Sequence, residues 1–141
     1  MTNYRLIYAS SHNNLSFEAI DQILTVSRSN NARDYISGAL IVSERYFLQV
    51  LEGNRAKVAM RFTSIMKDPR HNSIEVISAR DNAQRLFSDW TMREIMTMSV
   101  KDRIMTPYLI DAQFIPIRLS EARIIELCQK LSLPDSLKRV A

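Results

Sequence analysis

A phenol and a carboxamide are the side chains best placed for chemistry in an otherwise apolar pattern. In segment 46–52, alternation places Gln49 in the middle of a mostly apolar strand, on one face with Phe47. A buried amide without a partner costs about 1–3 kcal/mol, so Gln49 needs hydrogen-bond partners. In segment 4–10 the same alternation places Tyr8 on one face of a strand. If the two strands are neighbours, the Tyr8 hydroxyl reaches the Gln49 amide, which can also bond a second polar group.

Each of these signals, taken singly, also has a purely structural interpretation. Tyr8 and Gln49 can form a hydrogen-bonded pair that seals a core, because buried tyrosines usually find a partner. The other positions of interest have similar alternatives: a helix C-cap at Asn30 and Asn31, a helix stop with a solvated arginine at Asp68, Arg70 and His71, and core residues at Trp90 and Met92.

Few of the residue types that enzymes and metal sites require are present among the 141 residues. Two glycines are too few for a Walker loop or a dinucleotide-binding GxGxxG turn. His12 and His71 are the only histidines and Cys128 is the only cysteine, so a catalytic triad or a zinc site lacks its ingredients. We therefore expect no enzyme and no metal ion.

Composition is that of one soluble globular domain, with 46% hydrophobic and 24% charged residues. The net charge of +4 comes from dispersed lysines and arginines, which argues against a nucleic-acid partner. Tyr46 and Phe47 are adjacent and point to opposite faces, so they form no stacking platform for bases. The chain has no run long enough for a membrane span and no signal-peptide pattern, and a lone cysteine fits a reducing cytoplasm.

Hydrophobic spacing predicts five strands and two helices in the first hundred residues. The order β-α-β-β-α-β-β predicts an α+β, ferredoxin-like sandwich, in which one five-stranded sheet has two helices on one face. The strands are expected at 4–10, 38–43, 46–52, 74–80 and 91–98, and the helices run from an N-cap at Ser16 to Asn30-Asn31 and from an N-cap at Asn54 to Asp68-Pro69.

A last helix is expected after residue 99, with its N-cap at Ser120. An open apolar sheet face would meet water, so this tail is expected to cover the face opposite the first two helices. Packing on a neighbouring molecule stays open as an alternative. The apolar stripe of the helix consists of Ile124, Ile125, Leu127, Cys128 and Leu131.

Six short segments are weak signals singly but informative together, because of their order and spacing along the chain. They are Leu6-Ile-Tyr8-Ala-Ser10, Ser27-Arg-Ser-Asn30-Asn31, Ile36-Ser-Gly38-Ala-Leu40, Phe47-Leu-Gln49-Val-Leu51-Glu52-Gly53, Asp68-Pro-Arg70-His71 and Phe87-Ser-Asp-Trp90-Thr-Met92. Together, over about residues 3–98, they closely resemble the BLUF family of flavin-binding blue-light sensors. The resemblance implies a flavin-binding domain at 1–98 and a helical extension at 99–141, as in the short stand-alone members.

This resemblance also implies a cofactor and the residues around it. The cofactor is expected to be noncovalent FAD, with FMN or riboflavin as alternatives, and its ring is expected between the two helices and facing the sheet. Ser64 stands where many members carry a cation toward the cofactor, so the contacts of its distal part stay open. The expected binding residues are Asn30, Asn31 and Gln49 at the polar edge, Ile23, Ser27, Leu40 and Phe47 along the ring, and Asp68, Arg70 and His71 at the outer part.

A photochemical role follows from the same resemblance. Tyr8 is expected to supply an electron and a proton through Gln49, whose amide ends rotated or tautomerised. The flavin absorption then shifts reversibly to the red. Trp90 and Met92, placed on the fifth strand, are expected to alternate near Gln49 and to relay the change to the C-terminal helices.

The light signal is expected to pass to a separate protein, such as a transcriptional or response-regulator-like partner. The resemblance also implies a homo-oligomer. The alternative is a ferredoxin-like protein-interaction module that has lost flavin photochemistry. The colour of the purified protein separates the two, because only the sensor is yellow.

Overall fold

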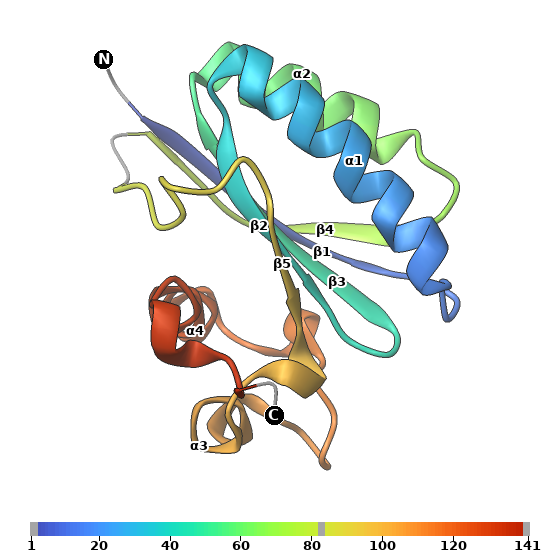
Figure 1. The fold of residues 1–141 in the computed structure, drawn as a ribbon, viewed down its shortest axis with the longest axis vertical. Helices are drawn as coiled ribbons and strands as arrows, with labels where there is room; N and C mark the ends of the chain where they lie inside the picture. Colours follow the sequence, from blue (N-terminus) through green and yellow to red (C-terminus); the bar gives the residue numbers. More distant parts are fainter. Residues whose placement is uncertain (1–2, 82–83, 140–141) are drawn as a thin grey trace.

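The computed structural model describes residues 3–81 and 84–139, and its elements follow the expected order (Figure 1). Short 3-10 turns connect the later elements. In chain order the strands and helices are β1 (Tyr4–Ser11), α1 (Phe17–Asp34), β2 (Ser37–Val42), β3 (Tyr46–Gly53), α2 (Arg55–Met66), β4 (Asn72–Asp81), β5 (Arg93–Met96), α3 (Asp102–Met105) and α4 (Glu121–Leu131).

One five-stranded sheet organises the molecule, in the strand order β4-β1-β3-β2-β5. β1 pairs antiparallel with both β3 and β4, β2 pairs antiparallel with β3, and β5 pairs parallel with β2. Helices α1 and α2 lie over one face, which we call the helix side, and the segments after β5 lie under the other, the tail side (Figure 1). The predicted α+β, ferredoxin-like class is confirmed.

All three expected N-caps are confirmed. The Ser16 hydroxyl accepts a hydrogen bond from the Ala19 N–H at 3.1 Å, and Asn54 Oδ1 accepts one from the Lys57 N–H at 3.1 Å. Ser120 does the same at the start of α4. These side chains satisfy backbone donors that lack a partner in the first turn of a helix, which fixes where each helix begins.

The end of α1 differs from the prediction. The helix does not stop at Asn30-Asn31 but continues to Asp34, and Tyr35 forms its left-handed C-cap with φ 55°. Asn31 is completely buried, and its Nδ2 donates a hydrogen bond to the Thr91 carbonyl at 2.8 Å. This contact, made with a residue far along the chain, outweighs the weak helix propensity of asparagine.

The fifth strand is also shorter than predicted. β5 covers Arg93–Met96 and not 91–98, so Trp90 and Met92, both placed on the fifth strand by the prediction, precede it. The Met92 carbonyl accepts a hydrogen bond from Arg28 Nε of α1, at 3.1 Å, and the Thr91 carbonyl is held by Asn31. α1 thus holds the backbone just before Arg93, and regular pairing with β2 begins only at Arg93.

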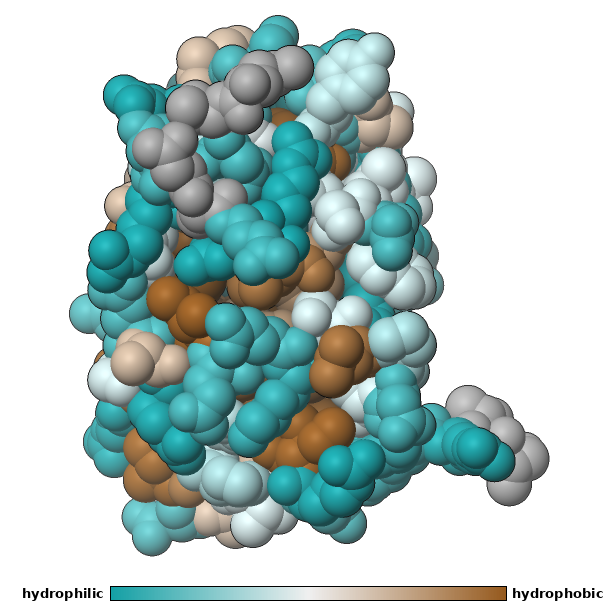
Figure 2. Space-filling view, turned by 90° about the vertical axis from the view of Figure 1, so that its left-hand side faces the viewer, coloured by the Kyte–Doolittle hydropathy of each residue, from teal (hydrophilic) through white to brown (hydrophobic). Residues whose placement is uncertain are grey.

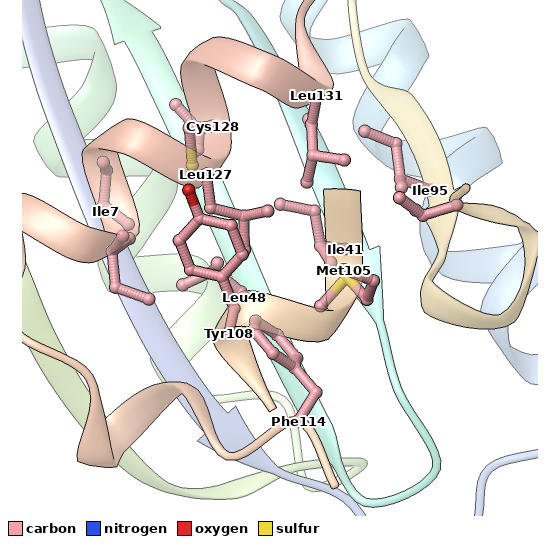
Figure 3. Packing of buried hydrophobic residues seen from close by; sticks show 14 of the residues in the cluster. Ile7, Ile41, Leu48, Ile95, Met105, Tyr108, Phe114, Leu127, Cys128 and Leu131 are labelled. Atoms are coloured by element: carbon pink, nitrogen blue, oxygen red, sulfur yellow. The ribbon is translucent and has the colours of Figure 1, made fainter. Parts of the chain in front are cut away.

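Apolar residues form one cluster on each side of the sheet. The tail-side cluster joins strand residues to the C-terminal segments (Figure 3). Ile124, Leu127, Cys128 and Leu131 of the predicted stripe are buried there, and Ile125 packs at its margin. The tail therefore packs on its own sheet. On the side of the molecule drawn in Figure 2, hydrophobic residues emerge only as separate patches between hydrophilic ones.

Candidate functional site

A cavity of about 140 Å³ opens between α1, α2 and the helix side of the sheet. Its wall combines apolar side chains with a few polar groups, which is the usual character of a small-molecule site. The lining residues are Tyr8, Ile23, Val26, Ser27, Asn30, Leu40, Phe47, Gln49, Arg61, Ser64, Ile65, Asp68, Arg70 and His71.

Tyr8 and Gln49 meet at the floor of this cavity. They are direct partners in the register of β1 and β3, and both side chains are buried. The Tyr8 O–H donates a hydrogen bond to Gln49 Oε1. Desolvation, helped by the negative charge of Asp68, raises the pKa of the Tyr8 phenol above its ordinary value. The phenol therefore keeps its proton at neutral pH.

The other end of the Gln49 amide is bonded much more weakly. Gln49 Nε2 donates to the sulfur of Met92 at 3.6 Å, and a thioether is a poor acceptor that cannot donate. Because the two ends of the amide have nearly the same shape but opposite hydrogen-bonding sense, rotating it would exchange which atom faces the phenol. The geometry thus provides an amide with one strong and one weak contact.

Asn31 carries an unsatisfied acceptor next to this site. Its Nδ2 is used by the Thr91 carbonyl, but its buried Oδ1 has no hydrogen-bond partner among the described residues. Leaving such an oxygen unpaired costs about 1–3 kcal/mol. The prediction placed Asn31 at the polar edge of a ligand, whereas in the structure only its neighbour Asn30 lines the cavity.

At the outer end of the cavity, Asp68 and Arg70 form a tight ion pair with Arg70 Nη2 2.5 Å from Asp68 Oδ2. This hydrogen bond from Arg70 lowers the pKa of the Asp68 carboxyl. His71 is buried, with Nδ1 2.7 Å from the Ser10 hydroxyl and Nε2 2.8 Å from the Ile65 carbonyl. Both ring nitrogens are therefore in use, and His71 offers the cavity a ring face and no free donor.

The two residues expected to alternate near Gln49 occupy different environments. Met92 is buried beside the Gln49 amide. Trp90 is 43% exposed and lies outside the cavity wall that the described residues form. The guanidinium of Arg93 lies over the Trp90 ring, 4.9 Å from its centroid.

Sequence reasoning about the ligand missed three lining residues, Val26, Arg61 and Ile65. Val26 lies one helical turn from both Ile23 and Asn30, so helical spacing was a signal that could have found it. Arg61 is held by Asp34, with Arg61 Nη2 2.6 Å from Asp34 Oδ2. Because Asp34 lies beyond the predicted end of α1, that prediction concealed this ion pair.

A sequence model of the BLUF family, described as sensors of blue-light using FAD, matches residues 4–93. The chain belongs to the BLUF family. Among curated proteins it is similar to the beta subunit of photoactivated adenylate cyclase from Euglena gracilis, with 29% identity over 93 residues. It is also similar to the blue light- and temperature-regulated antirepressor BluF of Escherichia coli (strain K12), with 30% identity over 67 residues.

The aligned regions cover 64% and 47% of this chain but only 11% of the cyclase subunit and 17% of the antirepressor. The solved structure of BlsA in its photo-activated state matches with a TM-score of 0.84 and 27% identity, over 97% of this chain and 99% of BlsA. BlrB, a BLUF protein in its dark state, matches with a TM-score of 0.76 and 26% identity, over 92% of this chain and 95% of BlrB. The match with the cyclase subunit thus covers only a small part of that protein.

The residues present fit a flavin. Ile23, Leu40 and Phe47 give the cavity apolar walls, which suit an aromatic ring. The ring of any flavin carries an imide N–H between two carbonyls, and the unpaired Asn31 Oδ1 is an acceptor that such a donor would satisfy.

The described residues form neither a metal site nor a membrane-spanning helix. Within residues 3–81 and 84–139, no cluster of three or more His, Cys, Asp or Glu side chains could hold a metal ion. Over the same residues, no helix is both long and apolar enough to cross a membrane.

Proposed function

We propose that this protein is a blue-light photoreceptor that binds FAD noncovalently and uses Tyr8 and Gln49 as its photochemical switch. The observation that carries the proposal is the buried hydrogen bond from the Tyr8 hydroxyl to Gln49 Oε1 at the cavity floor. A purely structural pair would have no need of a cavity beside it.

Nine residues of the cavity wall, together with Asn31 beside it, would hold the cofactor in three groups. Bound there, FAD would supply the absorption of blue light and, once excited, a strong one-electron oxidising power. FMN and riboflavin are the alternatives, because Ser64 brings no cation to the rim. The groups are Asn30, Asn31 and Gln49 at the polar edge, Ile23, Ser27, Leu40 and Phe47 along the ring, and Asp68, Arg70 and His71 toward the outer part.

Tyr8 is the electron and proton donor in this proposal. Its proton leaves toward Gln49 Oε1, which already accepts it in a hydrogen bond. Burial favours the protonated phenol, so Tyr8 has both an electron and a proton to give up when the excited cofactor oxidises it. When both have returned to Tyr8, the Gln49 amide is left rotated or tautomerised, and it presents a different hydrogen-bonding sense to the cavity. No covalent bond forms, so the dark state returns thermally.

The change at the Gln49 amide would be passed on through its weak contact with Met92. An amide turned by half a rotation would place an acceptor against the Met92 sulfur, which has no proton to donate. Met92 would then be released from Gln49, and Trp90 lies two residues before it. We propose that this segment passes the signal to the C-terminal helices.

The proposed output is contact with a separate protein of the transcriptional or response-regulator-like kind. The protein itself is proposed to be a homo-oligomer without enzymatic activity. The match over nearly the whole length of BlsA and BlrB supports a sensor of their size, whereas the partner and the oligomer rest on the family resemblance. A ferredoxin-like interaction module without flavin photochemistry is the competing function, and the shaped cavity argues against it.

Flavin content and difference spectra test the proposal. The purified protein is expected to be yellow, to release FAD on denaturation, and to show a reversible red shift under blue light. Gln49→Leu is expected to keep flavin and lose the shift. Gln22→Leu, the same replacement at an exposed position of α1, serves as the matched control and is expected to behave as the wild type. A colourless protein produced with flavin available would establish the interaction module instead.

A further inference from the structure

Arg93 connects the two sides of the sheet immediately after Met92. Neighbouring residues of an extended segment point to opposite faces. Met92 belongs to the helix-side cluster and contacts Gln49, whereas the Arg93 side chain reaches the tail side. There Arg93 Nη1 donates a hydrogen bond to the Leu131 carbonyl at 2.6 Å. Leu131 is the last residue of α4 and belongs to the tail-side cluster (Figure 3).

Burying this guanidinium is costly. Only 5% of Arg93 is exposed, and desolvation lowers the pKa of its side chain. The charge is offset by the negative end of the α4 dipole at Leu131 and by the face of the Trp90 ring. A neutral side chain of similar length would avoid the desolvation cost. The retained charge therefore indicates a role for Arg93 beyond filling space.

The strand that carries Arg93 is well suited to move. β5 has four residues and lies at the edge of the sheet, where β2 is its partner. The segment just before it is held by both β2 and α1, because Gly38 N–H of β2 donates to the Trp90 carbonyl at 3.0 Å and Arg28 of α1 donates to the Met92 carbonyl. A displacement of Met92 would thus be transmitted directly to the backbone of Arg93.

We propose that Arg93 is the positioning residue that couples the Gln49–Met92 contact to the C-terminal end of α4. The inference rests on the proposed function, since it needs a light-driven change at Gln49. When Met92 shifts, the Arg93 guanidinium is drawn from or pressed toward the Leu131 carbonyl. The last turn of α4 then opens or tightens, and the hydrogen-exchange rates of its amides change.

Other contacts keep the tail attached when this coupling is removed. The Lys138 N–H donates to the Ser99 carbonyl at 2.7 Å, and the Lys101 N–H donates to the Ser136 carbonyl at 3.0 Å. The Leu131 carbonyl also accepts a hydrogen bond from the Ser136 hydroxyl at 3.4 Å. A variant without the guanidinium is therefore expected to fold with its tail docked.

Hydrogen exchange of the α4 amides, in darkness and under continuous blue light, tests the coupling in the full chain with flavin bound. In the wild type, light is expected to change the exchange of amides 127–131 by about fivefold. Arg93→Met is expected to keep the red shift and lose most of this difference. Arg118→Met, the same change at an exposed arginine of the tail, is expected to keep both.

Two outcomes overturn the inference, and they are distinguishable. If the wild type shows no red shift, the proposed function fails and the coupling falls with it. If the red shift is normal but Arg93→Met keeps the full light-dependent difference in α4, only the coupling fails. Arg93→Gln removes the same charge with a different side chain and carries the same expectation, so an unstable Arg93→Met does not remove the test.

Discussion

The two sides of the sheet are built for different tasks. On the helix side, polar side chains such as Tyr8, Gln49 and His71 interrupt the apolar cluster, and a cavity separates them from α1 and α2. On the tail side, aliphatic side chains such as Ile41 and Leu127 pack against one another (Figure 3). One sheet thus combines a face whose polar side chains border a cavity with a face that is mostly an apolar core.

The polar groups on the helix side are also bonded unequally. Tyr8 and Gln49 form a strong hydrogen bond, the Met92 sulfur is a weak acceptor, and Asn31 Oδ1 lacks a partner among the described residues. The helix side therefore offers the Gln49 amide more than one possible set of contacts, whereas a close-packed apolar side tolerates changes of side-chain volume poorly. Changes on the tail side should therefore alter stability, and changes on the helix side should alter photochemistry.

The largest expected effect concerns Cys128, a thiol on the tail side. Desolvation by burial raises its pKa to about 12 from 9.0, so little thiolate exists at pH 8. Alkylation of the native protein by iodoacetamide is expected to be slower than that of the urea-unfolded chain by about a thousandfold. Native and unfolded rates within tenfold of each other would show that the tail side is not closed.

Removing a large tail-side residue is expected to lower stability without touching the photochemistry. Leu127 is completely buried, so Leu127→Ala should reduce the free energy of unfolding by about 2–5 kcal/mol. Urea titrations measure this change, and the red shift should persist. Leu133→Ala is the control, because that side chain is 59% exposed. A loss of the red shift in folded Leu127→Ala would remove the distinction between the two sides.

A buried carboxylate, Glu52, is a polar exception on the tail side. Its oxygens accept hydrogen bonds from the N–H groups of Leu86 and Phe87 and from the Ser37 hydroxyl, and so hold the segment that leads to Met92. Glu52→Gln replaces one acceptor by a donor. It should lower the free energy of unfolding by about 1–3 kcal/mol. A change within experimental error would mean that these contacts do not fix the segment.

The same variant has a signature in the pH dependence of stability. Burial raises the pKa of Glu52 above 4.5, so the folded state binds this proton more tightly than the unfolded state. The contribution is fully present below pH 4.5 and is lost as the pH rises through the raised value. Urea titrations across this range should show that fall in the wild type and a smaller one in Glu52→Gln. Equal slopes would contradict the assignment.

The smallest effect on stability is expected at Met92. Met92→Leu conserves volume, so it should cost less than about 1.5 kcal/mol. It removes the sulfur that accepts from Gln49 Nε2, and the rate of dark recovery after illumination should change while the red shift remains. Recovery at the wild-type rate would show that the Gln49–Met92 contact does not restrain the amide.

Local rules predicted much of this architecture. Strand alternation placed Tyr8 and Gln49 on the same side of neighbouring strands, and the caps Ser16, Asn54 and Ser120 marked where helices begin. These features depend on residues a few positions apart.

What the sequence concealed depends on contacts between distant segments. The end of α1 and the start of β5 moved because Asn31 and Arg28 take the carbonyls of residues 91 and 92. For the same reason the sequence could not show that Trp90 is exposed while Met92 is buried. The bond from Arg93 to Leu131 joins residues that no local pattern relates.

The light-minus-dark absorption spectrum of Tyr8→Phe tests the central claim most directly. This substitution removes only the hydroxyl that donates to Gln49 Oε1, and Tyr35→Phe removes a hydroxyl from a residue that is 82% exposed. We predict that Tyr8→Phe binds flavin as the wild type does and shows no reversible red shift, whereas Tyr35→Phe shows the full shift. A normal red shift in Tyr8→Phe would contradict the assignment of Tyr8 as the electron and proton donor.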